Sequence, residues 1–206
     1  MKIIKPYAEI VDNINGQDVL KKIEMCGRVC YKSECRIKDG SAEKFVASIV
    51  SRGHEAVLEH VSVTVKFVVD RGVSHEIVRH RLASYCQEST RYCNYMKDDF
   101  GTEITVIKPF FLDEGTAGWF FWATGCEEAE RAYFKLLEFG CSPQEARAVL
   151  PNSLKTELVM TANLREWRTF FKLRTAEAAH PQMREVTKPL LEEFKKTIPV
   201  VFDDIG

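Results

Sequence analysis

The most informative stretch of this sequence runs from Arg79 to Arg91 and reads RHRLASYCQESTR. It combines three guanidiniums and an imidazole with hydroxyl, amide and carboxylate side chains. Leu82 and Tyr85 indicate that these polar groups lie against apolar neighbours, where an unpaired polar group costs about 1–3 kcal/mol. Because the arginine fork binds phosphate or carboxylate in a bidentate manner, an anionic ligand is one expected partner. An internal salt-bridge network and an exposed basic helix are the alternatives.

Composition and charge describe a globular protein rather than a general nucleic-acid binder. The 206 residues are 45% hydrophobic, which suits one large domain with a substantial core. Lys and Arg total 29 against 30 Asp and Glu, whereas nucleic-acid binders usually carry a basic excess. We therefore expect a single domain spanning residues 1–206, with no nucleic-acid partner and with its clustered basic residues serving a small anionic ligand.

The cysteines and the apolar runs bear on the cellular compartment. The cysteine count is seven, which is odd, and no C-x-x-C pair occurs, so we expect free thiols and neither a disulfide framework nor a metal site. No apolar run approaches the roughly 20 residues that a membrane-spanning helix needs. The segment from Met1 to Asn15 lacks the apolar core of a signal peptide. These features predict a cytoplasmic protein without a membrane partner.

Hydrophobic periodicity predicts an α+β protein. Residues 61–69 alternate apolar and polar side chains, which is typical of a strand with one buried face. Shorter strands are expected at 8–11 and 104–107, and residues 154–162 fit either a strand or a helix. Helical spacing occurs at 17–30, 42–50, 74–81, 115–140, 163–174 and from 180 onward. This order favours a mostly antiparallel sheet covered by helices.

Two helix starts carry recognisable capping chemistry. Ser142, Pro143 and Glu145 form a capping-box pattern that opens a short helix leading to Arg147. Asn163 with a glutamate three residues later is a second such start. The chain has neither a G-x-G-x-x-G motif nor a P-loop, so a nucleotide must be held by side chains and helix ends.

A second polar cluster lies between His54 and His60. The spacing of the two histidines differs from the H-E-x-x-H zinc pattern. The cluster fits either a cap at the start of the following strand or a loop that lines a ligand. Four of the five histidines lie between residues 54 and 80, which favours a functional role.

The spacing R-H-R-x7-S-x-R at 79–91 resembles the signature of the flavin-dependent thymidylate synthases. The likeness extends over residues 8 to 195. It includes the motifs Gly53-His54-Glu55, Glu59-His60, Arg147 with Leu150-Pro151, Asn163-x-Arg165 and Leu173-Arg174. One arginine motif alone could occur in an unrelated protein, but the ordered series of motifs makes the resemblance specific.

The resemblance implies reductive methylation of dUMP to dTMP. Methylenetetrahydrofolate would supply the carbon, FAD would carry the hydride, and NADPH would reduce the flavin. Members of this family build shared sites in a homotetramer, so the same assembly is expected here. Activating uracil requires stabilisation of negative charge on its N3 and carbonyl edge, and the resemblance gives this catalytic role to Arg174.

The resemblance also implies a set of site residues. It assigns dUMP binding to Glu76, Arg79, Gln87, Glu88, Ser89, Thr90, Arg91, Arg147 and Arg174. It assigns FAD binding to Ala56, Arg79, His80, Arg81, Asn163, Arg165 and Thr169, and a place in the folate or flavin pocket to His54. Ser89 is expected to bind substrate, because a serine without an adjacent base is a weak nucleophile.

Three positions depart from the family pattern, namely Ala56, Cys86 and Thr169. The departures put side-chain contacts to FAD at 56 and 169 in doubt, whereas backbone contacts would survive. Arg165 and Arg174 have a simpler alternative role as surface ion-pair partners of Glu166 or Glu177.

Two other functions remain open from the sequence. A nucleic-acid-binding module could use residues 79–91 as a basic helix, although the near-neutral net charge argues against it. A non-catalytic flavin- or nucleotide-binding protein on the same scaffold would retain the same binding residues.

Overall fold

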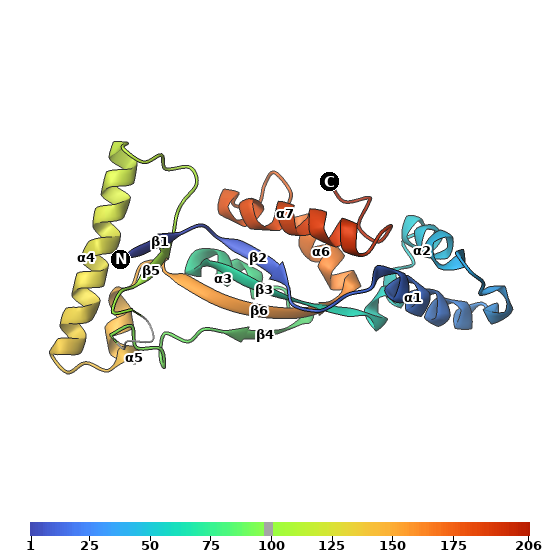
Figure 1. The fold of residues 1–206 in the computed structure, drawn as a ribbon, viewed down its shortest axis with the longest axis horizontal. Helices are drawn as coiled ribbons and strands as arrows, with labels where there is room; N and C mark the ends of the chain where they lie inside the picture. Colours follow the sequence, from blue (N-terminus) through green and yellow to red (C-terminus); the bar gives the residue numbers. More distant parts are fainter. Residues whose placement is uncertain (97–100) are drawn as a thin grey trace. The chain divides into compact units, whose positions relative to one another are not determined.

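The computed structural model describes residues 1–96 and 101–206 (Figure 1). The strands are β1 (Lys2–Ile4), β2 (Tyr7–Ile10), β3 (Ser62–Asp70), β4 (Ala83–Gln87), β5 (Thr105–Ile107) and β6 (Lys155–Asn163). The α-helices are α1 (Gly16–Cys30), α2 (Ser41–Ser51), α3 (Arg71–Ile77), α4 (Ala117–Glu138), α5 (Pro143–Ala146), α6 (Leu164–Arg174) and α7 (Pro181–Thr197). Short 3-10 helices are η1 (Glu34–Arg36), η2 (Glu55–His60) and η4 (Arg147–Val149). None of the helices in the described ranges is long and apolar enough to cross a membrane.

The chain forms two compact units. Unit 1 contains residues 1–7, 67–79 and 86–158, and unit 2 contains residues 8–66, 80–85 and 159–206. Strands β3, β4 and β6 each contribute residues to both units, because the division falls within them.

The strands form a four-stranded sheet in the order β2-β3-β6-β4 and a parallel pair of β1 with β5. The Leu164 amide donates to the Val61 carbonyl at 2.9 Å, and the hydroxyls of Thr64 and Thr161 lie 3.0 Å apart. The residue numbers of the paired positions rise along β3 while they fall along β6, so the two strands run antiparallel. The α+β class is confirmed, and the sheets are antiparallel in part.

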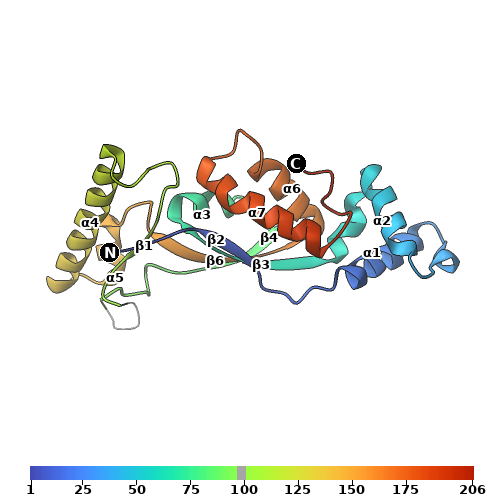
Figure 2. The same ribbon diagram turned by 45° about the horizontal axis from the view of Figure 1, so that its top comes forward.

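Unit 2 has a core of packed aromatic rings from α6, α7 and the segment that follows α7. The Trp167 indole N–H donates to the Val63 carbonyl of β3 at 3.0 Å, which fixes α6 against the sheet. Phe171, Phe194 and Phe202 have no exposed surface and meet one another edge to face. Burial of each ring stabilises the fold by about 1.5–3 kcal/mol. Helices α1 and α2 lie side by side in the same unit (Figures 1 and 2).

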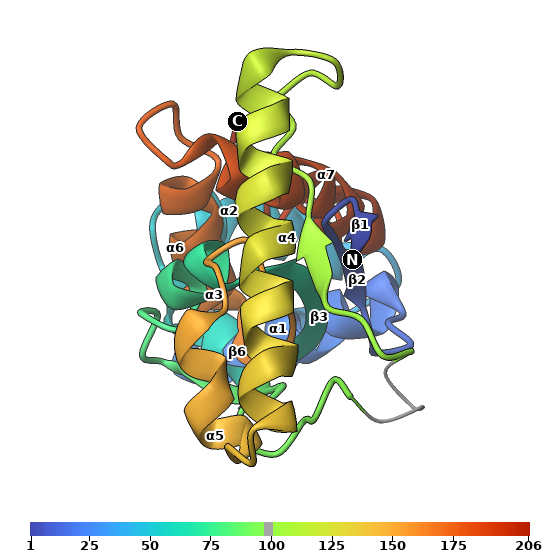
Figure 3. The same cartoon turned by 90° about the vertical axis from the view of Figure 1, so that its left-hand side faces the viewer.

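Unit 1 contains the long helix α4 (Figure 3), and a separate core of buried residues packs against it. Tyr133 and Cys126 of α4 pack there with Ile104 and Val106, which flank and form β5. The predicted helix at 115–140 and the predicted capping box at Ser142 are both confirmed, and Glu145 accepts hydrogen bonds from the Ser142 amide and hydroxyl.

The predicted helix at 74–81 is wrong in its bounds. The helix α3 begins at Arg71, because the Asp70 carboxylate accepts the Val73 amide at 2.7 Å and caps it. The helix ends at Ile77, before the polar stretch begins. Residues 79–91 therefore form a turn, the strand β4 and a second turn, and not the basic helix that the nucleic-acid-binding alternative assumed.

The ambiguous segment at 154–162 is a strand. Every second residue of β6 is buried, which is the period of a strand with one face in a core. Leu158, Met160 and Ala162 fill the buried face. The strand β1 was not predicted, because it is only three residues long and shows no clear alternation.

Candidate active site

The predicted site residues fall into both units. Unit 1 holds Glu76, Arg79, Gln87, Glu88, Ser89, Thr90, Arg91 and Arg147. Unit 2 holds His54, Ala56, His80, Arg81, Asn163, Arg165, Thr169 and Arg174. Each unit brings together part of the predicted set.

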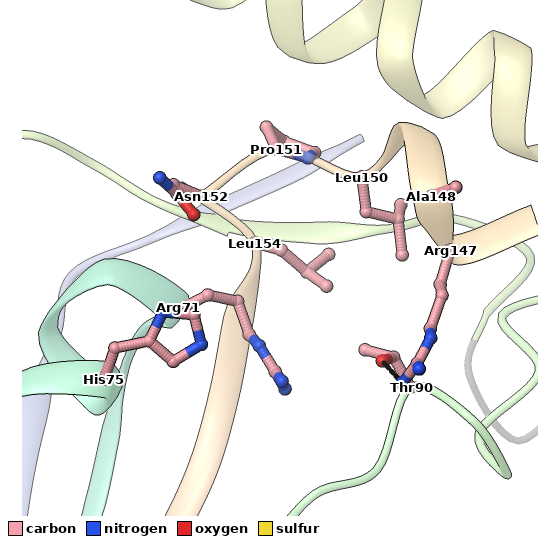
Figure 4. A pocket seen from close by; sticks show the side chains of 9 residues that line it. All are labelled: Arg71, His75, Thr90, Arg147, Ala148, Leu150, Pro151, Asn152 and Leu154. Carbon is pink, nitrogen blue, oxygen red and sulfur yellow. Dashed lines mark hydrogen bonds between the residues drawn. The ribbon is translucent and has the colours of Figure 1, made fainter. Parts of the chain in front are cut away.

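A small cationic pocket lies in unit 1 (Figure 4). Its volume is about 260 Å³, and Arg71, His75, Thr90 and Arg147 line it beside Leu150. The Arg147 guanidinium donates to the Thr90 hydroxyl at 3.4 Å. Because ligand pockets for whole small molecules usually exceed about 300 Å³, this volume fits one anionic group better than a complete nucleotide.

Arg71 is a pocket residue that the sequence analysis missed. Its guanidinium lies 3.3 Å from the Glu88 carbonyl and 3.4 Å from the Thr156 hydroxyl, to both of which it donates. The strand predicted at 61–69 stops just before Arg71, and no site role was predicted for that residue. The aspartate cap three residues before Val73 was the available signal, since it places Arg71 in the first turn of a helix.

Arg91 and Ser89 lie beside the pocket in the chain but do not line it. The Arg91 side chain is exposed, donates to Gln144 of α5 at 3.1 Å, and lies over the Tyr92 ring. The Arg91 amide donates to the Ser89 hydroxyl at 3.3 Å, which closes the turn after β4. A ligand role for either residue stays a prediction.

Glu88 has partners within the fold. Its carboxylate accepts from Lys155 at 2.9 Å and from the Tyr95 hydroxyl at 3.1 Å. Burial alone would lower the pKa of Lys155, but its hydrogen bonds to Glu88 and Glu157 raise that pKa above the ordinary value. Glu88 is therefore part of an ion-pair network that holds the end of β4 against β6.

The remaining predicted residues of unit 1 lie on α3 and β4. The Gln87 amide donates to the Ser74 hydroxyl at 3.0 Å and to the Thr156 hydroxyl at 3.2 Å. Glu76 is half-buried on α3, and Arg79 is exposed in the turn that follows. Their contacts to dUMP stay predictions.

Unit 2 contains a chain of three polar side chains, in which His80 and Glu166 are buried and Arg174 is half-buried. His80 Nδ1 lies 3.1 Å from the Glu166 carboxylate, and Arg174 Nε donates to His80 Nε2 at 3.1 Å. A guanidinium can only donate, so Nε2 must be the unprotonated nitrogen and Nδ1–H must donate to Glu166. Glu166 thus selects the tautomer of His80, and the imidazole in turn orients the Arg174 guanidinium.

The surroundings favour a neutral imidazole. Burial lowers the pKa of His80, the positive charge of Arg174 lowers it further, and the hydrogen bond to Glu166 opposes this only partly. The Tyr85 hydroxyl donates to the His80 carbonyl at 2.6 Å, and burial together with the Glu166 charge raises the pKa of Tyr85 to about 12. The Phe170 ring meets the imidazole edge to face, with centroids 4.9 Å apart.

Two of the predicted FAD residues at the start of α6 have structural partners. Asn163 caps the helix, since its side chain accepts the Glu166 amide at 2.9 Å. Arg165 pairs with Glu59 at 2.6 Å, where both side chains are about half exposed. The ion pair considered as an alternative for Arg165 therefore exists, but its partner is Glu59.

The other predicted residues of unit 2 lie at its surface. Arg81, Thr169 and Ala56 are exposed, Ala56 being on η2. His54 is also exposed, and its Nδ1 lies 3.3 Å from the Tyr31 hydroxyl. Arg81 and Arg165 offer exposed guanidiniums, a donor set that fits an anionic ligand such as a diphosphate.

Comparison with known proteins identifies relatives over most of the chain. Residues 9–200 match the model of a family described as thymidylate synthase complementing protein. A flavin-dependent thymidylate synthase from Geobacter sulfurreducens is 34% identical over 196 residues, which cover 89% of this chain and 81% of that protein. One from Pyrococcus furiosus is 35% identical, covering 78% of this chain and 66% of that protein.

A solved structure shares the fold. The UMP/dUMP methylase PolB from Streptomyces cacaoi, bound with 5-Br dUMP, superposes with a TM-score of 0.80 at 24% identity. The match covers 98% of this chain and 96% of that one.

Proposed function

Because this chain belongs to the flavin-dependent thymidylate synthase family, we propose that it catalyses the reductive methylation of dUMP to dTMP. Methylenetetrahydrofolate supplies the one-carbon unit, and NADPH supplies the reducing equivalents. FAD, when bound, carries the hydride between the nicotinamide and the transferred carbon. Residues 1–206 act as one domain of this family.

The observation that carries the proposal is the cationic pocket of unit 1. Arg71 and Arg147 line it with the Thr90 hydroxyl, and its volume suits a single phosphate. A phosphate monoester is bound best by guanidiniums and hydroxyls together, because charge-assisted hydrogen bonds are about twice as strong as neutral ones. We assign this pocket to the 5′-phosphate of dUMP. Ser89 and Arg91, in the adjoining turn, complete the phosphate contacts.

Arg174 stabilises the charge that develops on the uracil ring. Its Nε is already bound to His80, so the guanidinium is held by a buried partner before substrate arrives. A preorganised cation stabilises developing charge better than water does, because it needs no reorientation during the reaction. His80 accordingly acts as a positioning residue for Arg174.

The flavin is held by residues of unit 2. Arg81 and Arg165 are exposed guanidiniums that fit its diphosphate, and the amide N–H groups of Asn163 remain for the ligand because the cap uses only the side-chain oxygen. His54 lines the flavin and folate pocket. The contact at Ala56 is made through the backbone, and the contact at Thr169 through its exposed side chain, because the Thr169 amide is used within α6.

The protein assembles as a homotetramer that shares its active sites. Supporting this, Phe120 and Phe121 near the start of α4 are 63% and 73% exposed, a large apolar surface for a helix of a monomer. Burial of these rings between copies would remove them from water.

The proposal is tested by an absorption spectrum of the purified protein. NADPH is then added anaerobically, with and without dUMP. We expect a flavin band that bleaches with NADPH and recovers with dTMP formation once methylenetetrahydrofolate is added. Flavin binding and reduction without any dTMP would instead identify a non-catalytic flavin protein. Absence of a flavin band, even after incubation with FAD, would contradict both.

A further inference from the structure

Unit 2 contains two adjoining cavities lined by cations, between α1, η1 and α2. Their volumes are about 430 and 710 Å³, and they share Arg28, Arg36 and Phe45 among their walls. We call the two cavities together the cation channel. The cations that line one or both cavities are Arg28, Lys32, Arg36, Lys38, Lys44 and Arg52. Asp39 is the carboxylate that lines the second cavity.

One wall of the cation channel carries a charge that is already neutralised. The Arg28 guanidinium donates to buried Glu24 at 2.8 Å and lies over the Phe45 ring, 4.5 Å from its centroid. The Glu24 carboxylate also accepts from the Ser41 hydroxyl at 2.8 Å, which ties α1 to α2. This wall shapes the channel rather than attracting a ligand.

Among the described residues, the other cations of the channel have no ion-pair partner. Within residues 1–96 and 101–206, no carboxylate lies at ion-pair distance from Lys32, Arg36, Lys38, Lys44 or Arg52. Five like charges along one channel repel one another unless an anion lies between them. Lys32 also has a φ of 47°, a left-handed conformation that a lysine rarely adopts. The arrangement favours an anionic ligand.

The distribution of the charges indicates which kind of anion. Lys32 and Arg52 line only the first cavity, Arg36 lines both, and Lys38 and Lys44 line only the second. A phosphate is a compact charge that requires converging donors, whereas these cations are spread along the channel. A chain of separate carboxylates fits such a series, one charge to each cation.

The channel begins beside His54. Tyr31 lines the first cavity, and its hydroxyl lies 3.3 Å from His54 Nδ1. We propose that the cation channel binds the oligo-γ-glutamate tail of the folate co-substrate, with the folate ring system near His54. This inference rests on the proposed function, since that function places the folate at His54.

The test compares methylenetetrahydrofolate carrying one or five γ-glutamates, with equilibrium binding to the FAD-loaded protein measured by calorimetry. We expect the pentaglutamate to bind about tenfold more tightly than the monoglutamate, because several exposed ion pairs, each worth about a twofold gain in affinity, add together. The double variant Arg36→Gln/Lys44→Gln should lose this difference and keep the monoglutamate affinity. High salt should reduce the difference in the unmodified protein.

The matched control is Lys22→Gln/Lys196→Gln, which removes two exposed positive charges outside the channel and should keep the tenfold difference. Equal binding of the two folates, or a difference that survives Arg36→Gln/Lys44→Gln, would overturn the inference. A higher KM for NADPH but not for NADH in that variant would also overturn it, since the channel would then hold the 2′-phosphate.

Formation of dTMP from the monoglutamate separates this inference from the function. Because the monoglutamate does not need the channel, its turnover tests the proposed function alone. If dTMP forms but both folates bind with equal affinity, the proposed function stands and only the tail site is overturned. If neither folate binds, both are overturned.

Discussion

Three side chains depend on one another for their hydrogen bonds, namely Glu166, His80 and Arg174. Glu166 is a buried carboxylate that accepts the only N–H of a neutral imidazole, and that imidazole accepts the Arg174 Nε–H. A buried donor left without an acceptor costs about 1–3 kcal/mol. The tautomer of one ring therefore links a structural glutamate to the guanidinium that we propose is catalytic.

Replacing Glu166 tests this link. In Glu166→Ala, the His80 Nδ1–H loses its acceptor, so we expect a loss of about 1–3 kcal/mol in the free energy of unfolding and a several-fold fall in kcat. Glu166→Gln retains a carbonyl acceptor and should remain within about 1 kcal/mol of the unmodified protein. Urea denaturation and turnover assays measure both. Equal losses in the two variants would show that the charge of Glu166 matters rather than its acceptor.

The stability of the protein should fall as the pH is lowered below neutrality. The pKa of His80 in the folded state lies below its ordinary value of 6.5, so the unfolded chain takes up a proton first. The contribution of the neutral imidazole is complete above about pH 6.5 and is lost as the pH falls through the folded pKa. Urea midpoints measured between pH 7.5 and 5 should decline less in His80→Gln. The decline should be retained in His60→Gln, because His60 is exposed.

Arg71 should contribute to substrate binding through the phosphate. In Arg71→Gln, we expect the KM for dUMP to rise about 10- to 100-fold, the equivalent of one charge-assisted hydrogen bond. Deoxyuridine lacks the phosphate, so its weaker turnover should be unchanged. A parallel loss with both substrates would mean that Arg71 acts through its contacts to Glu88 and Thr156.

The helix α6 shows how one element serves both stability and the site. Its first residue follows Asn163, whose side chain caps the helix, and its last residue is Arg174. Trp167 and Phe171 face the core from the same helix, while Arg165 and Thr169 face solvent. The helix period of 3.6 residues separates the two roles onto different faces.

Substitutions at Asn163 can separate capping from flavin binding. Asn163→Asp retains an oxygen that accepts the Glu166 amide, so stability should be unchanged while FAD affinity falls through loss of the amide donor. Asn163→Ala removes the cap as well and should lower the free energy of unfolding by about 1 kcal/mol. Thermal unfolding and flavin titration measure the two effects. Unchanged FAD affinity in Asn163→Asp would remove Asn163 from the flavin site.

The whole molecule has an exposed aromatic surface that its own core does not use. Phe120 and Phe121 project from α4, whereas Cys126 and Tyr133 of the same helix are buried in unit 1. If these rings lie between subunits, Phe120→Ser/Phe121→Ser should lower the assembly state in analytical ultracentrifugation. Met25→Ser, at an exposed apolar residue of α1, should leave it unchanged. A tetramer that persists in the Phe120→Ser/Phe121→Ser variant would place the interface elsewhere.

Local signals in the sequence were sufficient for much of this protein. The family, anticipated from the arginine spacing at 79–91, is confirmed by the match over residues 9–200. The helices α1, α2, α4 and α7 were predicted closely, because their apolar spacing and caps lie within a few residues of one another.

The tertiary structure alone decided which side chains meet. Arg71 joins Arg147 at one pocket, and Glu166 reaches His80 across 86 positions of sequence. The stretch at 79–91 has the composition of a helix surface, but pairing with β6 makes part of it a strand. Strand pairing and packing bring together residues that are distant in the chain, and a pattern with a period of two or 3.6 residues contains no information about such partners.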